Sequence, residues 1–198
     1  VTVPTGESDT DVALRRELAE RLLPSALVGA DALAVHRLLR RLNAARALAA
    51  EEAGDETAPI PLTVADLVDD PETWRATLEK GAEAPGRRGW NDRSLARALT
   101  KAAAMWEIAA SGGERPQERL WALWEACGVG EDWRDRAIAS DEASAWFDDQ
   151  LDAVVALMRV ADVWEQRNPS GSAVQFASEL LSGSVPIDTI SRVGVRPG

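Results

Sequence analysis

Apolar residues recur at intervals of three and four positions along most of the chain, which is the spacing of a helix with one buried face. Residues 31–52 and 140–167 carry the longest stretches of this pattern. Alternating runs of β-branched residues and Asn-Gly turns, which are typical of strands and hairpins, are missing from the sequence. The pattern therefore predicts an all-α fold, a compact orthogonal bundle of about eight to ten helices with no significant sheet.

Capping residues, prolines and glycines divide this pattern into elements. Residues 53–61 have the composition of a linker, and residues 81–90 that of a flexible, glycine-rich loop. We expect a lead-in over residues 1–8, one helical domain over residues 9–194 and an exit segment over residues 195–198. The predicted helices cover residues 9–23, 31–52, 72–80, 92–110, 116–127, 131–138, 140–167 and 172–182, with short helices after Thr63 (paired with Asp66 in a capping box) and at Pro186.

Three of the eight tryptophans lie within residues 116–138. Pro116 suits the first turn of a helix there, and Gly128 suits its left-handed end. Because large aromatic rings bury the most area per residue, we expect the centre of the fold in this stretch and nearly all tryptophans in the core. The predicted apolar face consists of Leu120, Trp121, Leu123, Trp124 and Cys127.

The chain is acidic, with a formal net charge of −11 and a pI near 4.6. This argues against a domain whose main function is binding phosphates, but it allows a local basic patch. The single Cys127 excludes an internal disulfide, fits a reducing compartment and is expected in the core. No apolar stretch is long enough for a transmembrane helix, and no secretory signal is present. The start at Val1 suggests an excised or processed piece of a longer chain.

Motifs for catalysis are missing from the sequence. There is no GxxxxGK[ST] loop, GxGxxG, HExxH, CxxC pair or GxSxG. One histidine and one cysteine cannot form a zinc site of the usual kind. We therefore expect no catalytic residue, no metal site and no cofactor in this chain, and we interpret its carboxylate clusters as solvated helix faces.

A glycine turn at residues 27–31 precedes a helix that carries His36, Arg37, Arg40 and Arg41 within two turns. Helix N-termini bind phosphate through free N–H groups, and arginines on the following turns could extend such contact along a DNA backbone. Asp31 at that terminus opposes it. The alternative is that these arginines solvate the outer face of the helix and pair with acids such as Glu17 and Glu20.

Four stretches together resemble a known subdomain. They read RLLPSALVGADALAVHRLLRRL (21–42), LWALWEA (120–126), QLDAVVALM (150–158) and VPIDTISRVG (185–194). This pattern is similar to the accessory 2B subdomain of UvrD/Rep-type superfamily-one DNA helicases, and it looks closest to the actinobacterial Adn-type helicase–nucleases. The resemblance covers residues 9–194.

The resemblance implies a fragment of an ATP-dependent 3′–5′ DNA helicase that acts in DNA repair. The subdomain would have no ATPase site of its own, whereas the parent motor would use ATP and Mg. It would contact duplex or forked DNA and the motor domains, regulate unwinding, and lie in the cytoplasm without a membrane partner. The residues that match the family's DNA-contacting turn and the helix after it are Gly29, Ala30, His36, Arg37, Arg40 and Arg41, although the family's Gly-Ile-Gly form of the turn is not kept.

Two other functions remain open on the sequence. One is a helical protein–protein interaction module that binds a partner through an apolar groove and has no nucleic-acid role. The other is a free-standing enzyme, for which the sequence offers no site.

Overall fold

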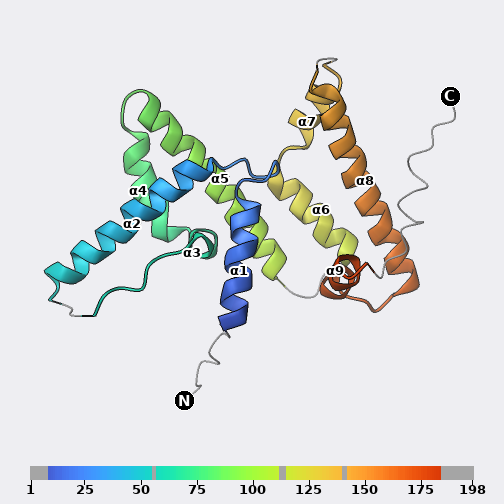
Figure 1. Cartoon of the computed structure of the whole chain (residues 1–198). Coiled ribbons are helices and arrows are strands. Elements are labelled where there is room, and N and C mark those ends of the chain that lie inside the picture. Colours follow the sequence, from blue (N-terminus) through green and yellow to red (C-terminus); the bar gives the residue numbers. More distant parts are fainter. Residues whose placement is uncertain (1–8, 55–56, 112–114, 140–141, 184–198) are drawn as a thin grey trace. The chain divides into compact units, whose positions relative to one another are not determined.

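The computed structural model describes residues 9–54, 57–111, 115–139 and 142–183. Over these residues the chain forms nine α-helices and no strand, which confirms the predicted all-α fold (Figure 1). None of the helices found there has the length and apolar character needed to cross a membrane. The helices are α1 (Asp9–Leu22), α2 (Ala32–Glu52), α3 (Val64–Asp69), α4 (Glu72–Ala82), α5 (Arg87–Ala110), α6 (Pro116–Cys127), α7 (Gly130–Ala137), α8 (Ser144–Arg167) and α9 (Ala173–Leu181).

The chain divides into two compact units, Val1–Glu107 and Ile108–Gly198. The first unit contains α1 to α4 and nearly all of α5, and the second contains α6 to α9. The prediction of one domain over residues 9–194 made no such division, and it stays a prediction. The predicted lead-in, the short helix at Pro186 and the exit segment lie outside the described residues.

Most helix ends lie where the sequence places them. Asp31 precedes α2, and its side chain accepts a hydrogen bond from the N–H of Ala34 at 2.6 Å. α6 begins at Pro116 and is followed by Gly128, which has a φ of 60°. In contrast to the prediction for residues 140–167, α8 begins only at Ser144.

The predicted loop over residues 81–90 is wrong in extent. α4 continues to Ala82 and α5 begins at Arg87, so only four residues connect them. Gly86 makes the turn with a φ of 71°. Gly89 lies in the first turn of α5, where a Cβ atom would overlap the backbone of Ala84. The close approach of the Ala84 backbone thus explains why a glycine occupies this helical position.

The first unit has a largely aliphatic core. Trp74 is 2 % exposed and donates its indole N–H to the backbone oxygen of Leu67 at 2.8 Å. Asn43 of α2 exchanges two hydrogen bonds with the backbone of Leu62, at 2.7 and 3.1 Å, and so holds the segment before α3 against α2. The largest aliphatic side chains in this core are Leu23, Leu38, Leu67, Leu78 and Leu99.

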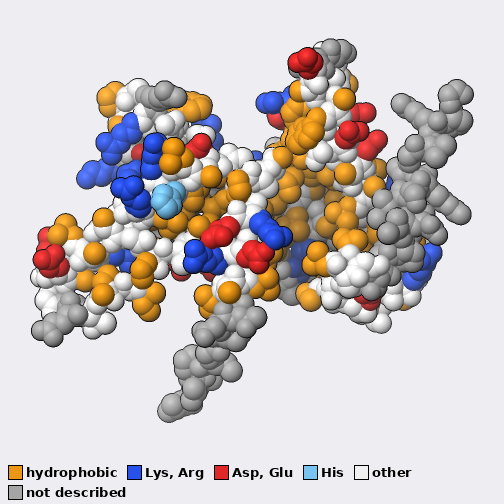
Figure 2. Space-filling view, viewed as in Figure 1, with side chains coloured by type: hydrophobic (Ala, Val, Ile, Leu, Met, Phe, Trp, Pro, Cys, Tyr) orange, Lys and Arg blue, Asp and Glu red, His pale blue; other side chains and the backbone are white. Residues whose placement is uncertain are grey.

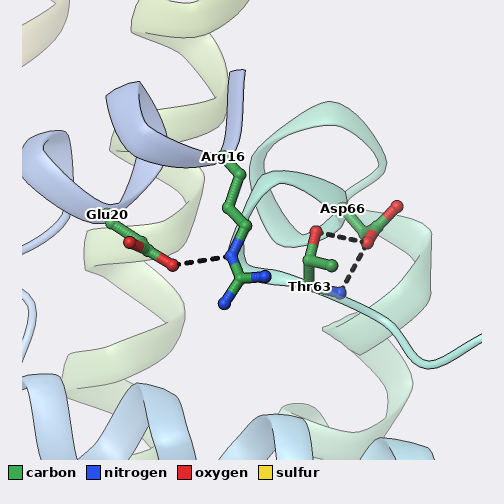
Figure 3. Close-up of polar contacts among 4 residues, drawn as sticks. All are labelled: Arg16, Glu20, Thr63 and Asp66. Carbon is green, nitrogen blue, oxygen red and sulfur yellow. Dashed lines mark hydrogen bonds and ion pairs between the residues drawn. The ribbon is translucent and has the colours of Figure 1, made fainter. Parts of the chain in front are cut away.

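α1 and α3 pack together in the first unit, and polar contacts order both of them (Figure 3). The Asp66 carboxylate accepts hydrogen bonds from the backbone N–H of Thr63 at 2.6 Å and from its hydroxyl at 2.7 Å. This confirms the predicted pairing of these two residues at the start of α3. On α1, Arg16 donates to Glu20 at 2.9 Å, one turn along the helix.

The second unit has a smaller and more aromatic core. Val160, Ala161, Trp164 and Phe176 form its buried cluster, against which Leu120, Leu157 and Leu180 pack. Trp133 joins α7 to its neighbours through edge-on contacts with Trp124 and Trp146, both at 5.8 Å between ring centres. Cys127 is fully buried, as predicted, and its thiol donates to the backbone oxygen of Trp124 at 2.9 Å.

Two predictions about the tryptophans are wrong. Trp90 is 64 % exposed, Trp121 is 55 % exposed and Trp146 is 46 % exposed, so these three are not core residues. The stretch 116–138 lies in the second unit alone, so it does not contribute to the separate core of the first unit. Helical spacing collects apolar residues on one face, but it does not reveal whether another element covers that face.

Candidate nucleic-acid interface

The arginines predicted to contact DNA lie together on the outer face of α2. Arg37, Arg40 and Arg41 are spaced by three and four residues, and all three side chains are exposed. The opposite face of the helix is buried through Val35, Leu38 and Leu42. The amphipathic pattern of α2 therefore places these arginines outward.

A fourth arginine joins them from α5. Arg88 lies in the first turn of α5 and lines a hollow of about 420 Å³ together with Arg37 and Arg41. Arg37, Arg40 and Arg41 line a neighbouring hollow of about 700 Å³. We call the face formed by Arg37, Arg40, Arg41 and Arg88 the arginine surface. Figure 2 shows positive side chains gathered over this part of the first unit, beside the single histidine.

Only one of the four arginines has an ion pair among the described residues. Arg41 lies 3.6 Å from Oδ2 of Asp92, a carboxylate that is 8 % exposed. Gly81 makes room for this carboxylate, because a Cβ atom at that position would overlap Asp92. Arg37, Arg40 and Arg88 form no salt bridge within the described part of the chain. Three guanidinium groups are thus available to an anion in solution.

The acids expected to neutralise this face have other partners. Glu17 pairs with Arg21 at 2.6 Å, and Glu20 pairs with Arg16 at 2.9 Å, both along α1. The alternative in which Glu17 and Glu20 pair with the arginines of α2 is therefore wrong about the partners. Its other half, a solvated face, agrees with the exposure of these arginines.

The glycine turn before α2 has little hydrogen-bonding capacity left for a phosphate. Gly29 has a φ of 73°, and its N–H donates to the backbone oxygen of Ser25 at 2.7 Å. The N–H of Ala30 donates to the backbone oxygen of Leu23 at 2.8 Å, and the Ala30 side chain is buried. Asp31 adds a carboxylate at the helix start. A phosphate contact is therefore better served by the arginine side chains than by this turn.

His36 is exposed on α2 but lines a different hollow, of about 160 Å³, with Glu20 and Leu39. The structure thus brings together Arg37, Arg40 and Arg41 and places His36 at the edge of the group. Gly29 and Ala30 lie at the start of the same helix and line a hollow that includes Arg37.

Sequence reasoning missed Arg88 and Trp90. Trp90 lines the hollow of about 440 Å³ that also contains Gly29, Arg37 and Asn91. An exposed indole beside arginines can stack on a nucleobase, which contributes about 1–3 kcal/mol per base in proteins that bind single strands. The segment GRRGW offered a signal, namely two arginines and a tryptophan between glycines. Its assignment to a loop concealed that signal.

The described residues contain no group of three or more His, Cys, Asp or Glu side chains that could hold a metal ion.

Comparison with known proteins adds no relative. No protein-family model matches the chain, and no curated protein or solved structure matches it either.

Proposed function

We propose that this chain is a helical accessory subdomain of an ATP-dependent DNA helicase, similar to the 2B subdomain of the UvrD/Rep type. Its role is to contact the backbone of duplex DNA and to regulate unwinding by the motor domains. The observation that supports this proposal most directly is the arginine surface, on which Arg37, Arg40 and Arg88 have no ion-pair partner among the described residues.

Guanidinium groups suit such a contact. Each presents several N–H donors in a planar fork that matches two phosphate oxygens, and its charge persists at every physiological pH. Phosphate contacts of this kind position a protein on DNA without reading the sequence. Because the chain as a whole is acidic, the attraction is confined to this surface and is weak. Weak, reversible contact suits a regulatory role better than tight anchoring does.

The proposal includes the parent protein. ATP and Mg would bind to the motor domains, and the subdomain would contribute neither a catalytic group nor a metal ligand. The parent would act in the cytoplasm, in DNA repair, and its partners would be duplex or forked DNA and its own motor domains.

Fluorescence anisotropy of the full chain with a labelled forked duplex tests this function. We expect binding at low salt that weakens as salt increases, because counterions are released when arginines neutralise phosphates. Changing Arg37 and Arg40 together to Ala should lower the affinity and reduce the slope of log K against log salt by about 2, one for each lost phosphate contact.

A matched control separates local contact from net charge. Arg16 and Arg21 are also exposed arginines of the first unit, but each pairs with a glutamate of α1. Changing both to Ala alters the net charge equally and should leave the affinity unchanged. The DNA-contact function is wrong if the wild-type chain fails to bind even at low salt, or if the two double variants bind equally weakly.

An interaction module without a nucleic-acid role is the second candidate. It is favoured by an open apolar groove on the second unit, lined by Trp121, Val155 and Met158 among others. Duplex binding that is lost in the Arg37→Ala, Arg40→Ala variant would argue against this candidate as the sole function.

A further inference from the structure

An apolar groove lies between α6 and α8 of the second unit, and residues at the start of α7 also line it. Its volume is about 1060 Å³. We call it the α6–α8 groove. Its apolar lining consists of Trp121, Trp124, Leu151, Val154, Val155 and Met158.

The groove exists because α8 has two apolar faces. Val160, Ala161 and Trp164 point into the core with α6 and α9. A second row, Leu151, Val154, Val155 and Met158, follows the spacing i, i+3, i+4 and i+7 and lines the groove. Val155 is 44 % exposed and Trp121, across the groove on α6, is 55 % exposed. Leu151, Val154 and Met158 are partly buried in this row.

The row formed by Leu151, Val154, Val155 and Met158 has the length and spacing to contact another helix. Met158 lies seven positions after Leu151 on α8, which corresponds to about 10 Å or two helical turns. A groove between two helices, lined at this spacing, is the surface on which the apolar face of a third helix packs. The volume lies at the upper limit of small-molecule pockets, which enclose about 300–1,000 Å³. An elongated macromolecular segment therefore fits better than a compact ligand.

The rim of the groove carries three acidic and two basic side chains. Glu125, Glu131 and Asp162 line it, against Arg134 and Arg159. Arg134 already pairs with Asp135 at 3.3 Å, so its charge is partly compensated. Glu125 accepts a hydrogen bond from the uncharged indole N–H of Trp121 at 2.9 Å. Across residues 108–198, acidic residues outnumber basic ones by about two to one. A partner with positive flanks is therefore favoured.

We propose that the α6–α8 groove binds an amphipathic helix of a partner protein. The partner helix places apolar residues at i, i+3 or i+4 and i+7 into the groove, and Lys or Arg residues beside them face Glu125, Glu131 and Asp162. This inference does not depend on DNA binding, because all the residues that carry it lie in the second unit.

Three labelled peptides of about 18 residues, or five helical turns, test the proposal with the full chain. The first carries Leu at helical spacing and Lys elsewhere, and the second replaces every Lys with Glu. The third has the composition of the first but spreads its leucines around the helix. Fluorescence anisotropy should show that the first peptide binds at least about tenfold more tightly than the other two. Equal binding of the first and third would mean that charge alone attracts the peptide and would overturn the proposal.

Two valines provide a matched pair of variants. Val155 lies in the groove, whereas Val174 of α9 is 72 % exposed and lies outside it. Val155→Asp should weaken binding of the first peptide at least about tenfold, and Val174→Asp should leave it unchanged, since only the first adds a charge to a buried interface. Circular dichroism verifies that both variants fold. If Val155→Asp does not fold, Trp121→Ala serves instead, because its side chain is largely exposed.

The wild-type chain and the Val155→Asp variant also show whether something other than a partner helix binds in the α6–α8 groove. If sedimentation shows that the wild-type chain is a dimer and that Val155→Asp is a monomer, the groove binds a second copy and the proposal is wrong. The proposal is also wrong if the wild-type chain binds none of the peptides. It is wrong as well if Val155→Asp and Trp121→Ala bind the first peptide as tightly as the wild type does.

Discussion

The two units differ in how completely they bury their apolar side chains. In the first unit, large aliphatic side chains from four of its helices and from the turn after α1 are fully covered, as Leu38, Leu67, Leu78 and Leu99 show. In the second, Trp164 and Phe176 anchor a small core, while apolar side chains of α6 and α8 remain open to solvent. Apolar periodicity of similar strength thus produces a closed core in one place and an open groove in the other.

The exposed surfaces differ in the same way. The first unit presents three arginines that have no ion pair within the described part of the chain, and the second presents apolar side chains beside three acidic and two basic ones. A phosphate backbone fits the former and a basic amphipathic helix fits the latter. Because the two surfaces lie on different units, mutations should separate their functions.

The largest effect should come from removing a tryptophan that the first unit encloses. Trp74→Ala leaves a cavity in the core and removes the hydrogen bond to Leu67, so we expect a loss of about 3–5 kcal/mol in the free energy of unfolding. Urea denaturation followed by circular dichroism measures it. Trp121→Ala, which removes a half-exposed tryptophan of the second unit, should cost far less. Similar losses in unfolding free energy for Trp74→Ala and Trp121→Ala would contradict the view that the first unit is the more completely packed one.

A substitution at Gly171 tests how tightly the second unit is packed around the buried Trp164. A Cβ atom at this position would overlap the ring of Trp164, so Gly171→Ala should destabilise the second unit by about 1–3 kcal/mol. Thermal unfolding followed by near-ultraviolet circular dichroism reports the change. Ser170→Ala, at the exposed neighbouring position, is the control and should stay close to the wild type. An unchanged midpoint in Gly171→Ala would show that Trp164 moves freely.

A substitution at Asn43 tests how far the stability of the first unit depends on polar contacts. Asn43→Ala removes both hydrogen bonds to Leu62 and leaves partly buried backbone groups without partners, at a cost of about 1–3 kcal/mol. Urea denaturation gives the value. Asn91, which is exposed, provides the control substitution. Equal stability of the two variants would mean that water replaces the lost bonds.

The smallest effect should come from an exposed ion pair. Arg16→Ala breaks the pair with Glu20 on α1, where both side chains face solvent, and should cost about 0.3–0.5 kcal/mol. The same denaturation experiment measures it, with added salt expected to reduce the difference. A cost above that of Asn43→Ala would contradict the view that buried contacts stabilise the first unit.

The sequence predicted what depends on local spacing. The pair Thr63 and Asp66, the start of α6 at Pro116 and its end at Gly128 follow from rules that involve residues close in the chain. The beginning of α5 did not follow, because it includes Gly89, a residue that composition assigns to a loop but that lies where a Cβ atom would overlap the backbone of Ala84. The division into two units depends on contacts between distant residues and also could not be predicted.

The same distinction applies to the candidate site. The spacing of Arg37, Arg40 and Arg41 on one helix is enough to place them on one face. Arg88 and Trp90 join them only because α5 lies beside α2 in the folded chain, as the ion pair between Arg41 and Asp92 shows. Helical periodicity gives no information about this neighbourhood.

The ion pair between Arg41 and Asp92 also sets up a competition for one guanidinium group. Oδ2 of Asp92 is buried and accepts no hydrogen bond within the described residues, and Arg41 forms an ion pair with it at 3.6 Å. A phosphate that draws Arg41 outward leaves that carboxylate buried and uncompensated, which opposes the exchange. The guanidinium group of Arg41 is thus less available to a phosphate than those of Arg37 and Arg40. Replacing Arg41 with Ala should therefore change the salt dependence of duplex binding less than replacing either of its neighbours does.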